Sequence, residues 1–212
     1  MSNHPFFDFL KQRLEKSLPG REAQLKMSPV PLDPDVVLPK EKTDTGHPSS
    51  VLIPLFPDIN RQLNVIFTLR TDTIRHAGQI SFPGGRSEVN ENPKETALRE
   101  SEEEIGLDRN KIRIAGPITP LYLYRTDNQI TPFIGILNEK PELTRNPNEV
   151  EEIIPAKLDD LRSEKYLVQE QWDLPGLSMD VPYWKIHQVP LWGATAMIMS
   201  ELLELYREFL DG

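Results

Sequence analysis

The sequence predicts an α+β or α/β sandwich, in which helices cover a mixed β-sheet. Apolar residues alternate with a period of two in several runs between turn-forming residues, and Leu63–Arg70 is the clearest of these strands. Helical periodicity is confined to a few segments, which is typical of this class. The 212 residues suffice for one domain with extensions, and such a domain buries about 70% of the surface that its unfolded chain exposes.

The first 57 residues predict a helix followed by extended chain. Residues 5–18 have helical apolar spacing, which predicts an amphipathic helix docked on the domain. Prolines then recur between residues 28 and 57, which disfavours regular helix. A strand is expected at Ser50–Phe56, at an edge of the sheet because it contains Pro54.

The rest of the chain alternates strands with three further helices. A Gly/Pro-rich loop is expected over 75–92, a helix over 93–105, a short helix over 155–163 and a C-terminal helix over 193–210. Two runs, Tyr166–Leu174 and Val181–Val189, predict a hairpin. The remaining strands are expected near 111–119, 121–125 and 129–137, with a short strand or turn at 149–154.

Composition excludes several classes of function. The 24 basic and 33 acidic residues give a net charge of −9, which argues against a protein that mainly binds nucleic-acid backbones. The chain has no cysteine, so disulfides, thiolate metal sites and thiol nucleophiles are excluded. No apolar run approaches the ~18 residues of a membrane span, and residues 1–18 lack the apolar core of a signal peptide. We therefore expect a cytoplasmic protein without a membrane partner.

The helix expected over 93–105 carries an unusual acidic face. Asn92 can cap it, Pro93 suits its first turn and Gly106 suits its end. Glu100, Glu103 and Glu104 stand at i, i+3 and i+4, so their Cβ atoms lie about 5–6 Å apart and their charges repel. A hard divalent cation such as Mg²⁺ would turn this repulsion into attraction. The alternative is a solvated charged helix face.

The loop before this helix supports the metal interpretation. Gly84 and Gly85 let the backbone approach a ligand closely. The full pattern is Gly85, five residues, Glu91, seven residues, Arg99-Glu100, then Glu103-Glu104 and Gly106-Leu107. It resembles the Nudix box, the signature of the Nudix hydrolase family. Ser101 departs from the apolar residue usual after Arg-Glu, which concerns helix packing more than chemistry.

The resemblance implies a fold, a reaction and a set of residues. The fold would be an α/β/α sandwich with a mixed sheet, residues 49–212 forming the Nudix domain and residues 1–48 an N-terminal helix and proline-rich extension. The reaction would be hydrolysis of a diphosphate with Mg²⁺ or Mn²⁺. Glu100, Glu103, Glu104 and the Gly85 carbonyl would hold metal, and Arg99 would orient a carboxylate of the box.

The residue that accepts the proton from the attacking water stays open between three carboxylates. Glu100 is the first choice, because it belongs to the box itself. Glu149 and Glu152 in the NEVEEI stretch are the alternatives, since this stretch often supplies a further acidic residue in the family.

A second resemblance suggests the substrate. Residues 67–85, FTLRTDTIRHAGQISFPGG, are similar to a signature of the coenzyme A diphosphatase branch of the family. The residues expected to bind substrate are Arg70, Arg75, His76, Gln79 and Gly84. The reaction would then yield 3′,5′-ADP and 4′-phosphopantetheine or its acylated form. A homodimer is the oligomeric state that the family suggests, and no nucleic acid is expected as a partner.

Two other functions remain as alternatives. One is a Nudix hydrolase of ADP-ribose, another nucleotide sugar or a dinucleotide. The other is a Nudix-fold sensor without hydrolytic activity, although the box carboxylates are all present here. Four large aromatic residues near the C-terminus are interpreted as core, with a groove for adenine or pantetheine as the alternative: Trp172, Tyr183, Trp184 and Trp192.

Overall fold

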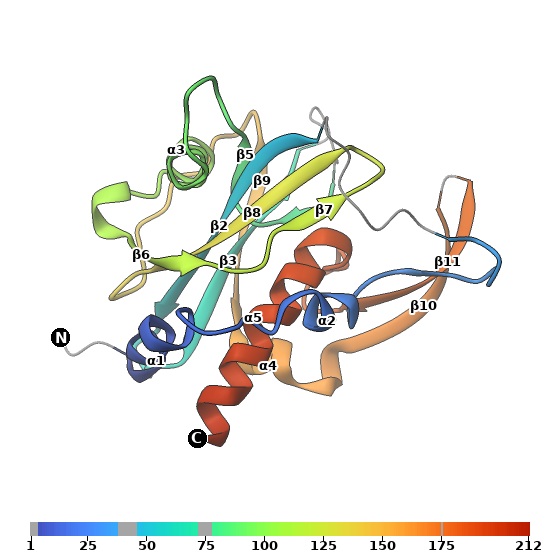
Figure 1. Cartoon of the computed structure of the whole chain (residues 1–212). Coiled ribbons are helices and arrows are strands. Elements are labelled where there is room, and N and C mark those ends of the chain that lie inside the picture. Colours follow the sequence, from blue (N-terminus) through green and yellow to red (C-terminus); the bar gives the residue numbers. More distant parts are fainter. Residues whose placement is uncertain (1–3, 38–45, 72–77, 175) are drawn as a thin grey trace.

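The computed structural model describes residues 4–37, 46–71, 78–174 and 176–212. A mixed sheet of eight strands lies between α3 on one face and α5, with α1, on the other (Figure 1), which confirms the predicted α/β sandwich. The helices are α1 Pro5–Arg13, α2 Gly20–Leu25, α3 Pro93–Ile105, α4 Leu158–Arg162 and α5 Gly193–Asp211, with single 3₁₀ turns at Arg109–Lys111 and Glu164–Tyr166.

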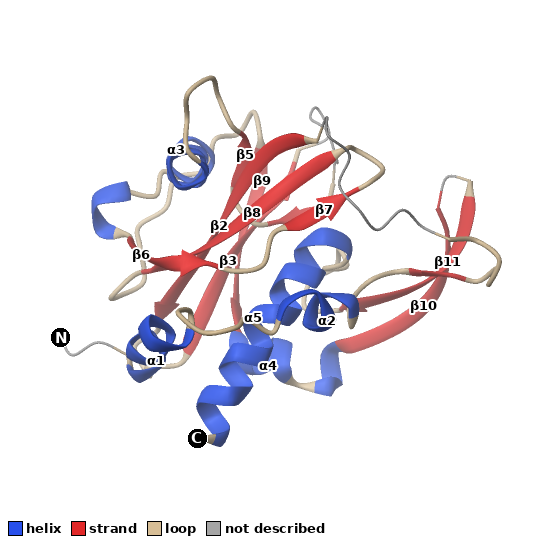
Figure 2. Ribbon diagram, viewed as in Figure 1, coloured by secondary structure: helices blue, strands red, loops and turns tan. Residues whose placement is uncertain are grey.

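The eight strands of the main sheet combine one parallel contact with several antiparallel ones. Their bounds are β2 His47–Pro57, β3 Leu63–Arg70, β4 Ile80–Ser81, β5 Gly84–Arg86, β6 Arg113–Pro117, β7 Leu121–Leu123, β8 Asn128–Ile136 and β9 Val150–Lys157. The central path runs β4-β3-β2-β8-β6, while β5 pairs with β2, β7 with β8 and β9 with β3 (Figure 2). The β2–β8 pair is parallel.

Strand β2 lies inside the sheet, so the expectation of an edge strand was wrong. β8 pairs along one side of β2, and on the other side β5 pairs with Ser49–Val51 while β3 pairs with Leu55–Pro57. Pro54 stands between these two partners, where neither β5 nor β3 has a residue in register. On the side of β8, Pro54 is in register with Gly135, but the neighbouring Leu55, whose carbonyl accepts the Leu137 N–H, is the residue that faces β8. The N–H that Pro54 lacks would point to the side of β5 and β3, where it has no partner in register, and a central strand therefore tolerates proline here.

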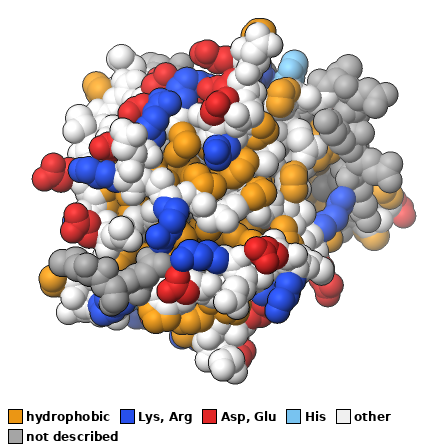
Figure 3. All heavy atoms as spheres, turned by 60° about the vertical axis from the view of Figure 1, so that its left-hand side comes forward, with side chains coloured by type: hydrophobic (Ala, Val, Ile, Leu, Met, Phe, Trp, Pro, Cys, Tyr) orange, Lys and Arg blue, Asp and Glu red, His pale blue; other side chains and the backbone are white. Residues whose placement is uncertain are grey.

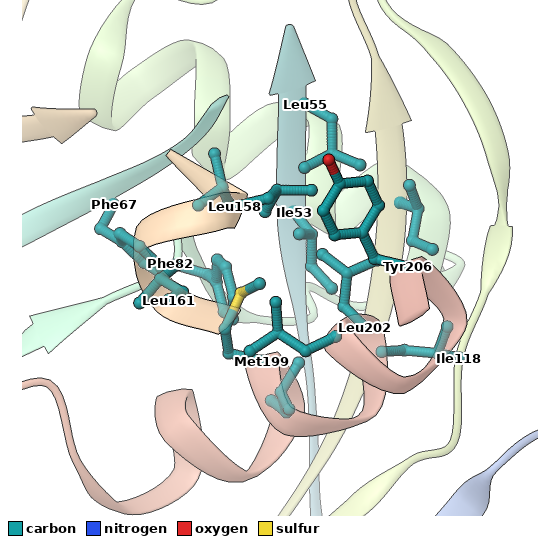
Figure 4. Close-up of a cluster of buried hydrophobic side chains, with 14 of the residues drawn as sticks. Ile53, Leu55, Phe67, Phe82, Ile118, Leu158, Leu161, Met199, Leu202 and Tyr206 are labelled. Atoms are coloured by element: carbon teal, nitrogen blue, oxygen red, sulfur yellow. The ribbon is translucent and has the colours of Figure 1, made fainter. Parts of the chain in front are cut away.

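Two hydrophobic clusters cover the two faces of the sheet. The cluster beneath α3 includes Leu52, Phe56 and Ala97. The larger cluster beneath α5 includes Phe67, Phe82, Met199 and Leu202, whose side chains converge in Figure 4. Alternate residues of β2 supply the two faces, as the two-residue period of a strand requires.

The N-terminal helices pack into the larger cluster. Phe6, Phe7 and Leu10 of α1 are fully buried against α5, as their spacing predicts. The helix ends at Arg13 instead of residue 18. After Arg13 the chain forms a turn, in which the Lys16 N–H donates to the Arg13 carbonyl at 3.1 Å and Arg13 Nη1 donates to the Ser17 carbonyl at 2.7 Å. Pro19 then disfavours helical backbone at Leu18. The short α2 was not predicted, because six residues with one apolar turn carry little periodic signal.

A smaller sheet projects from the body, on the right of Figure 1. It consists of β1 Val30–Pro31, β10 Leu167–Leu174 and β11 Leu177–Trp184, in the order β1-β11-β10. The predicted hairpin is present, but its second strand begins and ends earlier than the expected 181–189, because Leu174 pairs directly with Leu177 across a tight turn. Strand β9 is longer than expected and α4 correspondingly shorter.

Charge is not gathered in one place on the face that Figure 3 shows. Acidic and basic side chains are interspersed there with hydrophobic ones, despite the net charge of −9. Among the described residues, no helix combines the length and apolar character that crossing a membrane would require.

Candidate active site

Helix α3 begins and ends at the predicted residues. The Asn92 side chain accepts a hydrogen bond from the Glu95 N–H (3.0 Å), and the Glu95 carboxylate accepts one from the Asn92 N–H (3.1 Å). Gly106 ends the helix in the left-handed region, with φ of 65°. These local signals fix which carboxylates share the face that meets the sheet.

The two glycines of the preceding segment form a strand where a loop was expected. β5 pairs with β2, which brings its backbone under α3. A Cβ atom on Gly84 would lie 2.4 Å from the Ser50 carbonyl oxygen, and one on Gly85 would lie 2.4 Å from Oε1 of Glu100. Position 84 therefore requires glycine, because the clash is with the backbone of β2. At position 85 a Cβ atom would instead displace the Glu100 carboxylate.

Arg99 gathers three carboxylates. Its Nε and Nη2 donate to the two oxygens of Glu91 at 2.8 and 3.0 Å, and its Nη1 lies 2.9 Å from Glu100 and 3.0 Å from Glu103. Hydrogen bonds from Arg99 lower the pKa of Glu91 to about 2. The predicted orienting role of Arg99 thus has a geometric counterpart, with Glu91 as its bidentate partner.

Glu104 is buried, and few groups stabilise its charge. The Arg70 Nη1 lies 3.4 Å from its Oε1, and the Gly84 N–H donates to its Oε2 at 3.3 Å. Burial is the main cause that raises the pKa of Glu104 to about 8, while Arg70 and Gly84 act in the opposite direction and Glu100 and Glu149 add repulsion. Burial likewise raises the pKa of Glu100.

The structure distinguishes the two downstream carboxylates. Glu149 is close enough to Glu100 and Glu104 to raise the pKa of both, and its Oε1 accepts a hydrogen bond from Asn146 Nδ2 at 3.1 Å. Glu152, which is half exposed, lies 3.3 Å from His187 Nε2. Sequence reasoning missed Asn146, whose N–H also donates to the Glu104 carbonyl (2.8 Å). A lone asparagine in a loop gives no periodic or charge signal.

The remaining predicted residues fall into two groups. Arg75 and His76 lie outside the described residues. Gln79 follows the turn after β3, where its carbonyl accepts the Arg70 N–H (3.1 Å). Ser101, the departure from the usual box, is fully buried, and its hydroxyl donates to the Ala97 carbonyl at 2.7 Å. The helix thus satisfies this hydroxyl internally, and Ser101 affects packing alone.

The donors around β5 suit a hard divalent cation in kind. They are carboxylate oxygens and a backbone carbonyl, which Mg²⁺ and Mn²⁺ prefer. Glycine at position 85 keeps the space beside Glu100 free of a Cβ atom. Within the described ranges, no three acidic or histidine side chains are placed so that they could hold a metal ion together. The Arg99 guanidinium lies against Glu100 and Glu103. A cation there would compete with the Arg99 guanidinium for these oxygens.

Comparison with known proteins decides the family. Residues 46–175, more than half of the chain, match the family model for the NUDIX domain. The uncharacterized Nudix hydrolase NudL of Photorhabdus laumondii is 32% identical over 180 residues, which are 78% of this chain and 88% of NudL. The chain belongs to the Nudix hydrolase family. It is therefore a hydrolase of the class that acts on diphosphate bonds, and such hydrolases generally use divalent metals.

Other relatives extend this comparison. The mouse peroxisomal coenzyme A diphosphatase NUDT7 is 36% identical over 112 residues, which are 52% of this Nudix hydrolase and 47% of NUDT7. The crystal structure of the Mycobacterium smegmatis Nudix hydrolase RenU superimposes with a TM-score of 0.55, at 17% identity, over 76% of this chain and 86% of RenU. The structure of a Caenorhabditis elegans Ap4A hydrolase superimposes with a TM-score of 0.53 at 14% identity, over 78% of this chain and 98% of that hydrolase. These two structures show the fold alone.

Proposed function

We propose that this Nudix hydrolase cleaves the diphosphate of coenzyme A or its acyl derivatives, releasing 3′,5′-ADP and 4′-phosphopantetheine or its acylated form. The observation that carries the proposal is the segment 67–85. It resembles the coenzyme A diphosphatase signature, and its described ends, Arg70 and Gly84, both contact the buried Glu104. The mouse coenzyme A diphosphatase among the relatives supports the same substrate.

Metal binding is assigned to the acidic face of α3. Glu100, Glu103, Glu104 and the Gly85 carbonyl would hold Mg²⁺ or Mn²⁺, whose bound form polarises phosphoryl oxygens and lowers the pKa of water. Glu91 and Arg99 have the complementary task. Their bidentate ion pair fixes the guanidinium between α3 and the backbone of Arg86, from where its Nη1 would orient the side chains of Glu100 and Glu103.

Glu100 and Glu149 are the stronger proposals for the general base. A carboxylate whose pKa is raised by burial accepts a proton more readily near neutral pH, and this holds for Glu100. Glu149 lies beside it, oriented by Asn146. Glu152 stays an alternative, but its contact with His187 occupies one of its oxygens.

Substrate binding is assigned to the segment of chain between β3 and β5, residues 70–84. Arg70 lies at its start, Gln79 and Gly84 near its end, and Arg75 and His76 within it. A guanidinium presents five N–H donors, so Arg70 would hold Glu104 through one nitrogen and a substrate phosphate through others. This arrangement places a positive charge where the anionic substrate meets an acidic protein.

Product identification tests the proposal. The protein is incubated separately with coenzyme A, ADP-ribose, NADH and diadenosine polyphosphates, each with Mg²⁺ and with Mn²⁺, and products are identified by mass. We expect coenzyme A to give 3′,5′-ADP and 4′-phosphopantetheine. Consumption of ADP-ribose while coenzyme A survives would overturn the assignment of coenzyme A as the substrate. Binding without turnover of any compound would instead support a sensor.

A further inference from the structure

Three aromatic side chains form a cluster at the junction between the projecting hairpin and the body. The ring centroid of Trp172 on β10 lies 5.4 Å from that of Tyr183 on β11 and 5.2 Å from that of Trp192, which precedes α5. Tyr183 is buried, as the sequence led us to expect for the core, but Trp172 and Trp192 are only half buried. Part of each indole therefore remains open to solvent.

The chain around this cluster is fastened to the end of β3 that carries Arg70. His187 contacts Glu152, which is in register with Leu69. Thr195, in the first turn of α5, donates to the Ile80 carbonyl at 3.1 Å, and Ile80 directly follows the residue whose carbonyl accepts the Arg70 N–H. The His187–Glu152 and Thr195–Ile80 contacts therefore both involve residues next to those that pair with the end of β3 at Arg70. Trp192 precedes Thr195 by three residues, and Ile80 is in register with Leu69, which precedes Arg70. The cluster is thus tied to the end of β3 from which Arg70 reaches Glu104.

The cluster is held in a fixed arrangement. The Glu170 carboxylate accepts a hydrogen bond from Trp172 Nε1 at 3.3 Å and another from the Tyr183 hydroxyl. Paired hydrogen bonds between Trp184 and Leu191 close the segment that leads back to Trp192. Because the rings are already ordered, a ligand that packs on them would lose little binding energy to ordering them.

Charge around the cluster selects among the parts of the proposed substrate. On the face of β10 and β11 that carries Trp172 and Tyr183, the charged residue is Glu170, whereas Asp173 and Asp180 lie on the other face with Gln171. The two strands contain no Lys or Arg. A phosphate would meet repulsion here, and coenzyme A carries its third phosphate on the adenosine side. The pantetheine side beyond the diphosphate is an uncharged chain of methyl, methylene and amide groups. Aromatic surface suits such a chain, because it offers apolar area without charge.

We propose that the Trp172–Tyr183–Trp192 cluster binds the uncharged pantetheine arm of the substrate, while the phosphates stay with Arg70 and the α3 carboxylates. This inference rests on the proposed function and adds a site that recognises the arm extending from the diphosphate on the side opposite the adenosine. The 3′-phosphoadenosine end then lies away from the acidic hairpin.

Inhibition by the two product halves tests the assignment. In Trp172→Ala we expect the KM for coenzyme A and the Ki of 4′-phosphopantetheine to rise about tenfold, since roughly 50 Å² of lost apolar contact corresponds to that factor. The kcat and the Ki of 3′,5′-ADP should stay within twofold. Gln171→Ala is the matched control, because its exposed side chain points to the other face of the same strand. Trp172→Phe keeps a ring beside Tyr183 and should restore most of the affinity.

Tryptophan fluorescence gives a readout that needs no turnover. The chain has three tryptophans, of which Trp184 is buried, so uncharged pantetheine should change the emission of Trp172 and Trp192 in the wild type. Trp172→Phe should reduce this change. An unchanged 4′-phosphopantetheine Ki in Trp172→Ala, or a rise in the 3′,5′-ADP Ki alone, would overturn the inference even if coenzyme A is hydrolysed. Failure of the wild type to hydrolyse coenzyme A would instead contradict the proposed function.

Discussion

Two glutamates are almost completely buried on helices at opposite faces of the sheet, and they differ in how many short hydrogen bonds their carboxylates accept. Glu201 on α5 is 0% exposed, and its oxygens accept hydrogen bonds from Gly20 N–H, Gln24 Nε2 and Thr119 Oγ1 at 2.6 to 3.0 Å. Glu104 on α3 is 1% exposed and has two long contacts of 3.3 and 3.4 Å, with other carboxylates nearby.

The difference separates a carboxylate whose hydrogen bonds are satisfied within the fold from the one that we propose as a metal ligand. Glu201 ties α2 and the segment before β7 to α5, and neutral donors surround its charge. Among the described residues, Glu104 has no such set of short contacts, and Arg70 compensates its burial only in part. A cation beside Glu104 would supply the charge stabilisation that the described protein groups provide only in part. Glu201 already receives that stabilisation from its hydrogen-bond donors.

The largest expected effect is on catalysis. Glu104→Gln keeps the shape of the side chain but removes its charge, so we expect kcat to fall on the order of 10³-fold. Glu102→Gln is the matched control, because Glu102 lies on the same helix and pairs with Arg109 at the surface. Steady-state rates with coenzyme A and Mn²⁺ measure both. Equal activity of wild type and Glu104→Gln would remove Glu104 from the active site.

The second effect concerns metal binding without turnover. A divalent cation at about 100 times its Kd should raise the unfolding free energy of the wild type by about 2.7 kcal/mol. This increment should shrink in Glu104→Gln and persist in Glu201→Gln, because only Glu104 belongs to the proposed metal site. Thermal melts with and without Mn²⁺ give the comparison. An undiminished increment in Glu104→Gln would contradict the difference between the two glutamates.

The third effect is on stability. Glu201→Gln turns one acceptor oxygen into an NH₂ donor that faces donors from α2 or Thr119, so we expect a loss of about 1–3 kcal/mol. Activity of the folded protein should stay within twofold. Glu204→Gln, which removes surface ion pairs with Lys26 and Arg207, should cost less than about 1 kcal/mol. Urea unfolding gives the free energy of unfolding of the wild type and both variants. An unchanged value in Glu201→Gln would show that the hydrogen bonds of Glu201 do not stabilise the fold.

The fourth expected effect is a pH dependence of stability in metal-free protein. The pKa of Glu104 is about 8 when folded and near its ordinary value of 4.5 when unfolded. Between these values the native state binds the extra proton, so the unfolding free energy falls as pH rises from 4.5 to 8. Subtracting the curve of Glu104→Gln from that of the wild type isolates this slope. A difference that rises with pH would show that the pKa is lowered instead.

Local features of the fold could be predicted from the sequence. Asn92, Glu95 and Gly106 set the ends of α3 through contacts within four residues, and the period of Leu63–Arg70 predicted β3. The central position of β2 was mispredicted. Proline is expected at sheet edges because it lacks an N–H donor, and only the register of β5 and β3 shows that neither strand has a residue opposite Pro54. Whether a strand lies at the edge of a sheet depends on which other strands pair with it, and its own sequence does not specify this.

The candidate site divides in the same way. That Glu100, Glu103 and Glu104 share one side of a helix, and that the chain is a Nudix hydrolase, followed from spacing along the sequence. That Arg70 meets Glu104, and that Glu149 rather than Glu152 lies beside them, was decided by how β3 and β9 align around a bulge at Leu69/Arg70. Helical spacing fixes neighbours within a turn, whereas contacts between strands depend on register, which the whole packed sheet determines.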